Sequence, residues 1–219
     1  MFPGFLGNVL LGLLRRMQMK KFLWMFALVS ALGVRTGYAA DYDVDKAHTS
    51  IGFSVKHMVI SSVKGHFGDF SGGFSFDEKT KSITKVFAAI KATSINTDDA
   101  KRDEHLRSPD FLDVANFPEI TFNLKKAQAS KGGIRVTGDI TIHGVTKEIT
   151  LDGEFNGTAK DPWGNNRVGF TASGVIHRGD FGLKWNKLLE TGGMVVGEDV
   201  KLSVEVEGIE KKQGAPAAH

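Results

Sequence analysis

The sequence predicts an all-β domain of about eight antiparallel strands, each with one apolar face. The first observation is the alternation of apolar and polar residues with a period of two, as in 134–142 (IRVTGDITI). This alternation is typical of antiparallel sheets, because the strands of parallel sheets are buried on both faces and apolar throughout. The second observation is that glycine-containing turn signals separate the alternating segments. The third is that a single stretch, 98–108, has the features of an ordinary helix.

The alternating segments define the expected strands in order along the chain. They cover 51–55, 63–76, 120–124, 134–142, 149–155, 168–176 and 200–206. Within 63–76 the phase of the alternation slips by one residue beside Gly68-Asp69, which predicts a β-bulge in one long strand. His143-Gly144 predicts a tight hairpin. The pattern is compatible with a two-sheet sandwich or a closed barrel, and glycines on the apolar faces favour tight curvature: Gly138, Gly153 and Gly174.

The helical stretch 98–108 lies in the most highly charged part of the chain. We expect Thr97 or Asp98 to cap its first turn and Pro109 to end it. The apolar pair 111–112 (FL) that follows is expected to contact the apolar interior of the domain. Two ion pairs between residues four positions apart are expected along the helix: Asp98 with Arg102, and Asp103 with Arg107.

Residues 1–39 have the features of a secretory signal peptide. Basic residues and the short apolar run 22–34 precede small residues, so that cleavage is expected after Ala39. The apolar run is too short to span a bilayer comfortably. The true start of the protein is expected at Met17 or Met19. The expected location of the mature protein is the periplasm.

Removal of the signal peptide changes the electrostatic character of the chain. The folded domain is expected at 40–210, followed by a disordered polar tail at 211–219. The formal net charge of the whole chain is +3, but residues 1–39 hold five basic and no acidic residues, so the remainder is slightly acidic. Nucleic-acid binding is therefore not indicated. The chain has no cysteine, so the exported domain must be stable without disulfides.

The charged segment suggests catalysis only weakly. His105 has Asp103 and Glu104 as its nearest acidic neighbours, but residues one and two positions apart on a helix point in different directions. Ser108 is the one nucleophile nearby. The seven histidines of the chain are scattered without the spacing typical of metal sites. We therefore expect neither a catalytic residue nor a metal site.

The inward-facing aromatic side chains are the candidate ligand contacts. An eight-stranded barrel is just wide enough to be filled by its own side chains or to hold one slender ligand, and the residues alone leave both open. An outer-membrane barrel is not favoured, because the opposite strand faces carry many charges where such a barrel needs an apolar band. The expected pore-lining residues, with the last at the pore mouth, are Phe53, Phe67, Phe74, Phe122, Ile140, Phe155, Phe170 and Trp185.

Six motifs occur in order along the chain: DYDVDKAHTSIGFSVKHM (41–58), VKGHFGDFSGGFSFD (63–77), SINTDDAKRDEHLRSPDFLD (94–113), FPEITF (117–122), VTGDITIHGVTKEITL (136–151) and DPWGNNRVGF (161–170). In these motifs the chain resembles the YceI-like family of periplasmic polyisoprenoid-binding proteins. The resemblance implies an eight-stranded antiparallel, lipocalin-like barrel whose long hydrophobic pore takes the tail of an isoprenoid or similar amphiphile. It also implies that dimers are common and that no enzymatic activity is established. The sequence after Arg178 departs from the family pattern.

The leading functional hypothesis is a periplasmic carrier or sequestering protein for a polyisoprenoid, such as a quinone or an isoprenyl phosphate. No cofactor is expected besides the bound lipid, and a homodimer is implied by the resemblance. A second hypothesis is an enzyme acting on such lipids with His105 and the nearby carboxylates. A third is a stress-linked interaction module that partners a membrane protein, for instance a quinone-using cytochrome.

Overall fold

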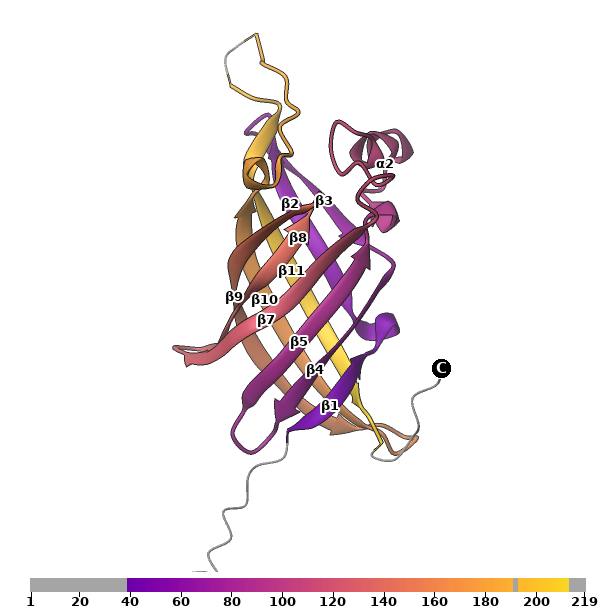
Figure 1. Ribbon diagram of the computed structural model, residues 1–219, viewed down its shortest axis with the longest axis vertical. Coiled ribbons are helices and arrows are strands. Elements are labelled where there is room, and N and C mark those ends of the chain that lie inside the picture. Colours follow the sequence, from indigo (N-terminus) through magenta and orange to yellow (C-terminus); the bar gives the residue numbers. More distant parts are fainter. Residues whose placement is uncertain (1–38, 191–192, 213–219) are drawn as a thin grey trace, which may run out of the picture. The chain divides into compact units, whose positions relative to one another are not determined.

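The computed structural model describes residues 39–190 and 193–212. Most of the predicted signal peptide and the tail from residue 213 lie outside the described residues. The described residues form one antiparallel sheet that closes into a barrel (Figure 1). Its segments are β1 (Ala40–Val44), β2 (Ser50–His57), β3 (Ser61–Phe67), β4 (Phe70–Asp77), β5 (Ser82–Lys91), β6 (Ile95–Asn96), β7 (Glu119–Ser130), β8 (Gly133–Ile142), β9 (Val145–Lys160), β10 (Asn166–His177) and β11 (Val196–Glu210). Short helices connect some of them: η1 (Lys46–His48), η2 (Ala92–Ser94), α2 (Ala100–Arg107) and η3 (Arg178–Phe181).

These segments make up eight long strands. The first three strands are each divided in two, as β1 with β2, β3 with β4, and β5 with β6. In each case the two halves pair with successive stretches of the same neighbouring strand. β11 pairs with β10 on one side and with β1 and β2 on the other, which closes the barrel. The predicted eight-stranded antiparallel barrel is therefore confirmed, and the sandwich alternative is excluded.

The bulge predicted within 63–76 is a break between two strand segments. β3 ends at Phe67 and β4 begins at Phe70. The N–H of Gly68 donates to the Ser94 carbonyl oxygen in η2, and the Asp69 carbonyl oxygen accepts from the N–H of Lys91 at the end of β5. The break turns one strand into two segments of opposite phase, which accounts for the slip in alternation.

The hairpin predicted at His143-Gly144 is present and joins β8 to β9. Both residues have left-handed backbone angles, with φ of 51° and 72°, as a type I′ turn requires. The strand β5, in contrast, was not singled out by its sequence. Its register against β4 shifts between Ser75 and Phe76, so its residues do not alternate strictly. The bulge interrupts the alternation of apolar and polar residues, so this alternation did not predict the strand.

The helix α2 is capped by Asp99, and the prediction of Thr97 or Asp98 as the cap is wrong. Asp98 has a left-handed φ of 62°, so the helix begins after it. The Asp99 Oδ1 atom accepts hydrogen bonds from the backbone N–H groups of Lys101 and Arg102 at 3.1 and 3.0 Å. The predicted pair of Asp98 with Arg102 is also wrong, because the Arg102 Nη1 atom lies 3.9 Å from Asp99 instead.

The second predicted ion pair of α2, between Asp103 and Arg107, is wrong as well. Asp103 is buried, and its Oδ1 atom accepts hydrogen bonds from the backbone N–H and the hydroxyl of Thr97 at 2.9 and 2.5 Å. The Arg107 guanidinium donates to the carbonyl oxygens of Thr93 and Ile95 at 2.8 and 2.7 Å. These charges fasten α2 to the chain that precedes it, so they stabilise its position on the barrel.

The buried side chains form two clusters at different heights in the barrel. Phe111 and Leu112 are 9% and 7% exposed, which confirms that this pair contacts the interior. The larger cluster consists of Phe70, Ile90, Ile95, Leu112, Ile120, Ile140, Ile142, Ile176 and Phe181. The smaller consists of Tyr42, Phe74, Phe76 and Val168. Among the described residues, no helix is both long and apolar enough to cross a membrane.

Candidate ligand-binding cavity

The barrel encloses an apolar cavity of about 220 Å³. Its wall is built from inward-facing side chains of strands around the barrel and is apolar almost throughout. Six of the eight predicted pore residues line it: Phe53, Phe67, Phe74, Phe122, Ile140 and Phe170. The wall also contains residues that the sequence analysis did not name as ligand contacts, among them Ala88, Ile120, Ala172, Leu202 and Val204. Ile120 and Ala172 share strand faces with Phe122 and Phe170, and Leu202 and Val204 lie on the apolar face of β11, so strand parity indicates these four; Ala88 lies on β5, which the sequence did not single out.

A second apolar cavity, of about 130 Å³, continues the first toward the end of the barrel that carries α2. The two cavities share five wall residues: Phe53, Phe67, Ile120, Ile142 and Leu202. Leu106 of α2 and the buried pair Phe111 and Leu112 cover the second cavity. The apolar interior is therefore one passage along the barrel, with the α2 segment over its outer end. We call this end the mouth.

The opposite end of the passage is filled by packed aromatic rings. Tyr42 stacks on Phe74 with ring centroids 5.2 Å apart, and burial followed by the nearby Glu210 raises the pKa of its phenol. Phe155 packs against Phe76 at 5.3 Å and against Phe170 at 5.6 Å. Phe155, predicted as a pore residue, is therefore not among the residues that line the cavity. It belongs to the aromatic packing that closes this end.

Trp185 also lies outside the cavity wall. Its ring packs against His105 with centroids 4.9 Å apart and against Phe111 at 5.1 Å. The His105 Nε2 atom lies 2.9 Å from the Asp110 carboxylate, and the Ser108 hydroxyl donates to the His105 carbonyl oxygen at 2.8 Å. The one nearby hydroxyl is thus not directed at the imidazole. The geometry is that of a packed cover over the mouth, not of a nucleophile activated by a base.

The chain beyond β10 is held at the mouth by Arg178, which is 3% exposed. Its guanidinium donates to the carbonyl oxygens of Gly197, Leu183 and Trp185 at 3.0, 2.6 and 2.9 Å. It also donates to Glu198 at 2.7 Å. Although Arg178 reaches the wall of the second cavity, its hydrogen bonds are used to fix the loop, so its role is structural.

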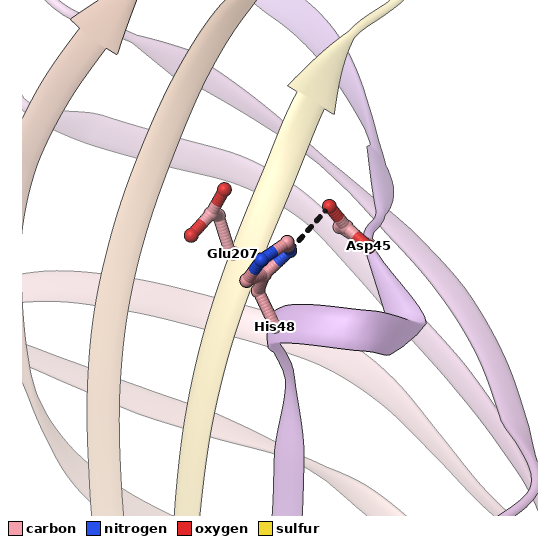
Figure 2. Close-up of side chains that lie close together, drawn as sticks. All are labelled: Asp45, His48 and Glu207. Atoms are coloured by element: carbon pink, nitrogen blue, oxygen red, sulfur yellow. Dashed lines mark hydrogen bonds and ion pairs between the residues drawn. The ribbon is translucent and has the colours of Figure 1, made fainter. Parts of the chain in front are cut away.

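Asp45, His48 and Glu207 come together on the outside of the barrel, as Figure 2 shows, with ligand-type atoms within 4.8 Å of one another. The positively charged group that contacts these carboxylates is the side chain of Arg167. The Arg167 Nη1 atom donates to Asp45 at 2.6 Å and to Glu207 at 2.5 Å, and its Nε atom donates to Asp161 at 2.9 Å. The arginine is 16% exposed and bridges the three carboxylates, so the group ties the junction of β1 and β2 to β10 and β11.

This network makes a testable prediction for stability at low pH. Hydrogen bonds from Arg167 and then His48 lower the pKa of Asp45 from 3.8 to about 2. Burial acts to raise the pKa of Asp161, but hydrogen bonds from Asn165 and Arg167 hold it well below its usual range. A carboxylate with a depressed native pKa contributes stability that is complete above its unfolded pKa and is lost as the pH falls through its native pKa.

We expect Asp45→Asn to lower the free energy of unfolding by about 2 kcal/mol at neutral pH. This difference from the wild type should shrink between about pH 4 and pH 2, because the wild-type carboxyl becomes protonated there. Thermal denaturation of both proteins across this range measures it. Asp43→Asn is the control, because Asp43 is exposed and its ion pair with Lys211 lies on the surface. A difference that persists unchanged at pH 2 would contradict the assignment.

Comparison with known proteins agrees with this architecture. Residues 42–208 match the model of the YceI-like domain family. A UPF0312 protein of Vibrio campbellii is 41% identical over 197 residues, which make up 88% of this chain and all of that protein. Among solved structures, the YceI protein of Campylobacter jejuni has a TM-score of 0.61 and 37% identity, and the match covers 77% of this chain and 96% of that one.

A more distant solved structure, a polyisoprenoid binding domain from Saccharophagus degradans, has a TM-score of 0.56 at 15% identity, over 79% of this chain and 99% of that one. At this identity the likeness concerns the fold alone. The match to the family, in contrast, extends over almost the whole barrel and includes close relatives in sequence. The chain belongs to the YceI-like domain family.

Proposed function

We propose that this protein binds a long-chain isoprenoid or similar amphiphilic lipid and carries or sequesters it in the periplasm. The observation that carries the proposal is the apolar passage, filled by aromatic rings at one end and covered by α2 at the other. A passage of this shape suits a slender apolar tail. A protein described as a polyisoprenoid binding domain has the same fold, so the fold is compatible with this ligand class.

The size of the passage sets how much of a tail it accommodates. The two cavities, of about 220 and 130 Å³, together lie at the lower end of the range of about 300–1,000 Å³ typical of ligand pockets. A passage of this size holds only part of a long isoprenoid chain. The remainder of a longer chain would leave through the mouth. Binding should therefore strengthen with tail length only until the interior is full.

Burial of apolar atoms supplies the binding energy in this proposal. A buried CH₂ group contributes about 0.8 kcal/mol before the costs of association, and larger ligands retain about 0.3 kcal/mol per heavy atom after them. A polar head group at the mouth orients the ligand and contributes less. The packing of His105 between Phe111 and Trp185 favours a cover for a bound lipid over a catalytic centre.

The experiment is a titration of the purified protein with prenyl alcohols of increasing length, followed by tryptophan fluorescence. We expect the affinity to rise about tenfold for each added five-carbon unit, which is about 1.5 kcal/mol, and to level off once the passage is full. Saturated alcohols of matched length show whether the isoprenoid branches matter. Absence of binding at every length, or tighter binding of short polar compounds, would contradict the proposal.

A further inference from the structure

The turn between β2 and β3 exposes three consecutive apolar side chains. Met58, Val59 and Ile60 are 36%, 76% and 81% exposed. Met58 and Val59 have left-handed φ angles of 49° and 65°, a conformation in which turns normally carry Gly, Asn or Asp and in which a β-branched residue is rare. Neither the backbone conformation nor packing within the barrel favours apolar residues here. Their presence indicates a contact outside the molecule.

The loop before β11 places two more exposed apolar side chains next to this turn. Leu188 and Met194 are 78% and 46% exposed and form an isolated β-bridge with each other. The backbone N–H of Met58 donates to the carbonyl of Val195 at 2.9 Å, so the loop and the turn adjoin. We call the five exposed residues the apical rim: Met58, Val59, Ile60, Leu188 and Met194.

The apical rim lies at the mouth of the apolar passage. Val55 and Val196, which stand close in sequence to the two rim segments, both line the second cavity. Leu183 at the start of the loop lines it too. Figure 1 shows the loop before β11 at the same end of the barrel as α2. A lipid that enters or leaves the passage here would pass directly beside the exposed apolar side chains.

The exposed charged residues of the two rim segments are three lysines and one acidic residue, Glu190. Lys56, Lys184 and Lys187 are exposed beside the rim residues, and none of them forms an ion pair within residues 39–190 and 193–212. At the start of β11, Glu198 pairs with Arg178, and the Asp199 carboxylate lies 2.7 Å from the His177 Nδ1 atom. Apolar side chains flanked by lysines are suited to the interface of an anionic bilayer, where each basic residue contributes about 1 kcal/mol.

We infer that the apical rim docks on the surface of an anionic lipid bilayer and places the mouth of the passage against the membrane. The inference rests on the proposed function, because the benefit of docking is a shorter path for a lipid between membrane and barrel. Docking itself can be tested without the lipid ligand. The rim side chains enter the interfacial region, the lysines face the anionic head groups, and the barrel remains outside the bilayer.

The test is co-sedimentation of the purified exported protein with vesicles of phosphatidylethanolamine and phosphatidylglycerol, compared with vesicles of phosphatidylcholine alone. We expect preferential binding to the anionic vesicles that weakens at high salt. The double variant Ile60→Ser/Leu188→Ser should bind about tenfold more weakly, equivalent to about 1.4 kcal/mol. Trp163→Ser is the matched control, because Trp163 is 79% exposed in the turn between β9 and β10, and it should bind like the wild type.

Two outcomes would overturn docking by the rim: equal binding of the wild type and the double variant, or loss of binding in the Trp163 variant alone. If the wild type sediments as a dimer, the double variant as a monomer, and neither binds vesicles, the rim is instead an interface between copies of this chain. The prenyl-alcohol titration separates this inference from the proposed function. A double variant that binds lipid normally but not vesicles supports docking, whereas vesicle binding by a protein that takes up no prenyl alcohol would contradict only the lipid-binding function.

Discussion

Replacement of Ala172 by tryptophan is expected to weaken the binding of a long prenyl alcohol by about 100-fold. Ala172 lies on β10 and lines the larger cavity, so the indole would occupy space that the proposal assigns to the lipid tail. The substitution adds about nine heavy atoms, and displacement of a similar number of ligand atoms at about 0.3 kcal/mol each costs about 2.7 kcal/mol. Fluorescence titration or competition with a labelled lipid measures the change.

The control for this variant is Ser173→Trp. Ser173 is the next residue on β10, is exposed, and points to the other face of the sheet. It should bind the lipid with an affinity close to that of the wild type. Thermal denaturation shows whether the larger core side chain is accommodated, since overpacking costs about 1–3 kcal/mol. A folded Ala172→Trp protein with unchanged affinity would show that the tail does not occupy this cavity.

Replacement of Arg178 by leucine is expected to lower the free energy of unfolding by about 3–5 kcal/mol. The change would leave the carbonyl oxygens of Leu183, Trp185 and Gly197 without the donor that they share. Leu183, Trp185 and Gly197 are half-buried, and a hydrogen bond contributes about 1 kcal/mol, so the loss of these three bonds and of that to Glu198 accounts for the expected change. Chemical denaturation by urea measures the loss.

The matched control is Arg135→Leu on the outer wall of the barrel. Arg135 is exposed and pairs with the exposed Asp152 at 3.0 Å. Surface ion pairs contribute about 0–1 kcal/mol, so this variant should be nearly as stable as the wild type. If the free energy of unfolding of the Arg178 variant falls by less than about 1 kcal/mol, the loop before β11 is held by contacts other than this arginine.

The strands were predictable where one face of the sheet is uniformly apolar. In β8 the alternation is unbroken because every second residue faces the interior, and the hairpin at His143-Gly144 marks its end. In β5 the register shift opposite Ser75 removes this regularity. The cap of α2 was displaced by one residue because Asp98 and Asp99 are both good caps, and only the backbone angle of Asp98 decides between them.

The candidate site was predictable only in part, for a related reason. The alternation along a strand shows that Phe122, Phe155 and Phe170 face inward. It does not show where each side chain lies along the axis of the barrel. The stagger of the strands places Phe155 against Phe76 at the closed end, and this depends on pairings distant in sequence. The role of Arg178 was missed because its hydrogen bonds go mainly to backbone carbonyl oxygens, which no side-chain pattern in the sequence reveals.

The central claim is that the barrel holds a lipid tail in its apolar passage. The most direct measurement is mass spectrometry of lipids extracted from the protein after purification from its native host, with the Ala172→Trp variant expressed and purified in parallel. We predict a long-chain isoprenoid or similar amphiphile in the wild-type extract and a much smaller amount in that of the variant. A wild-type protein that carries no such lipid, and that also binds no prenyl alcohol in vitro, would contradict the claim.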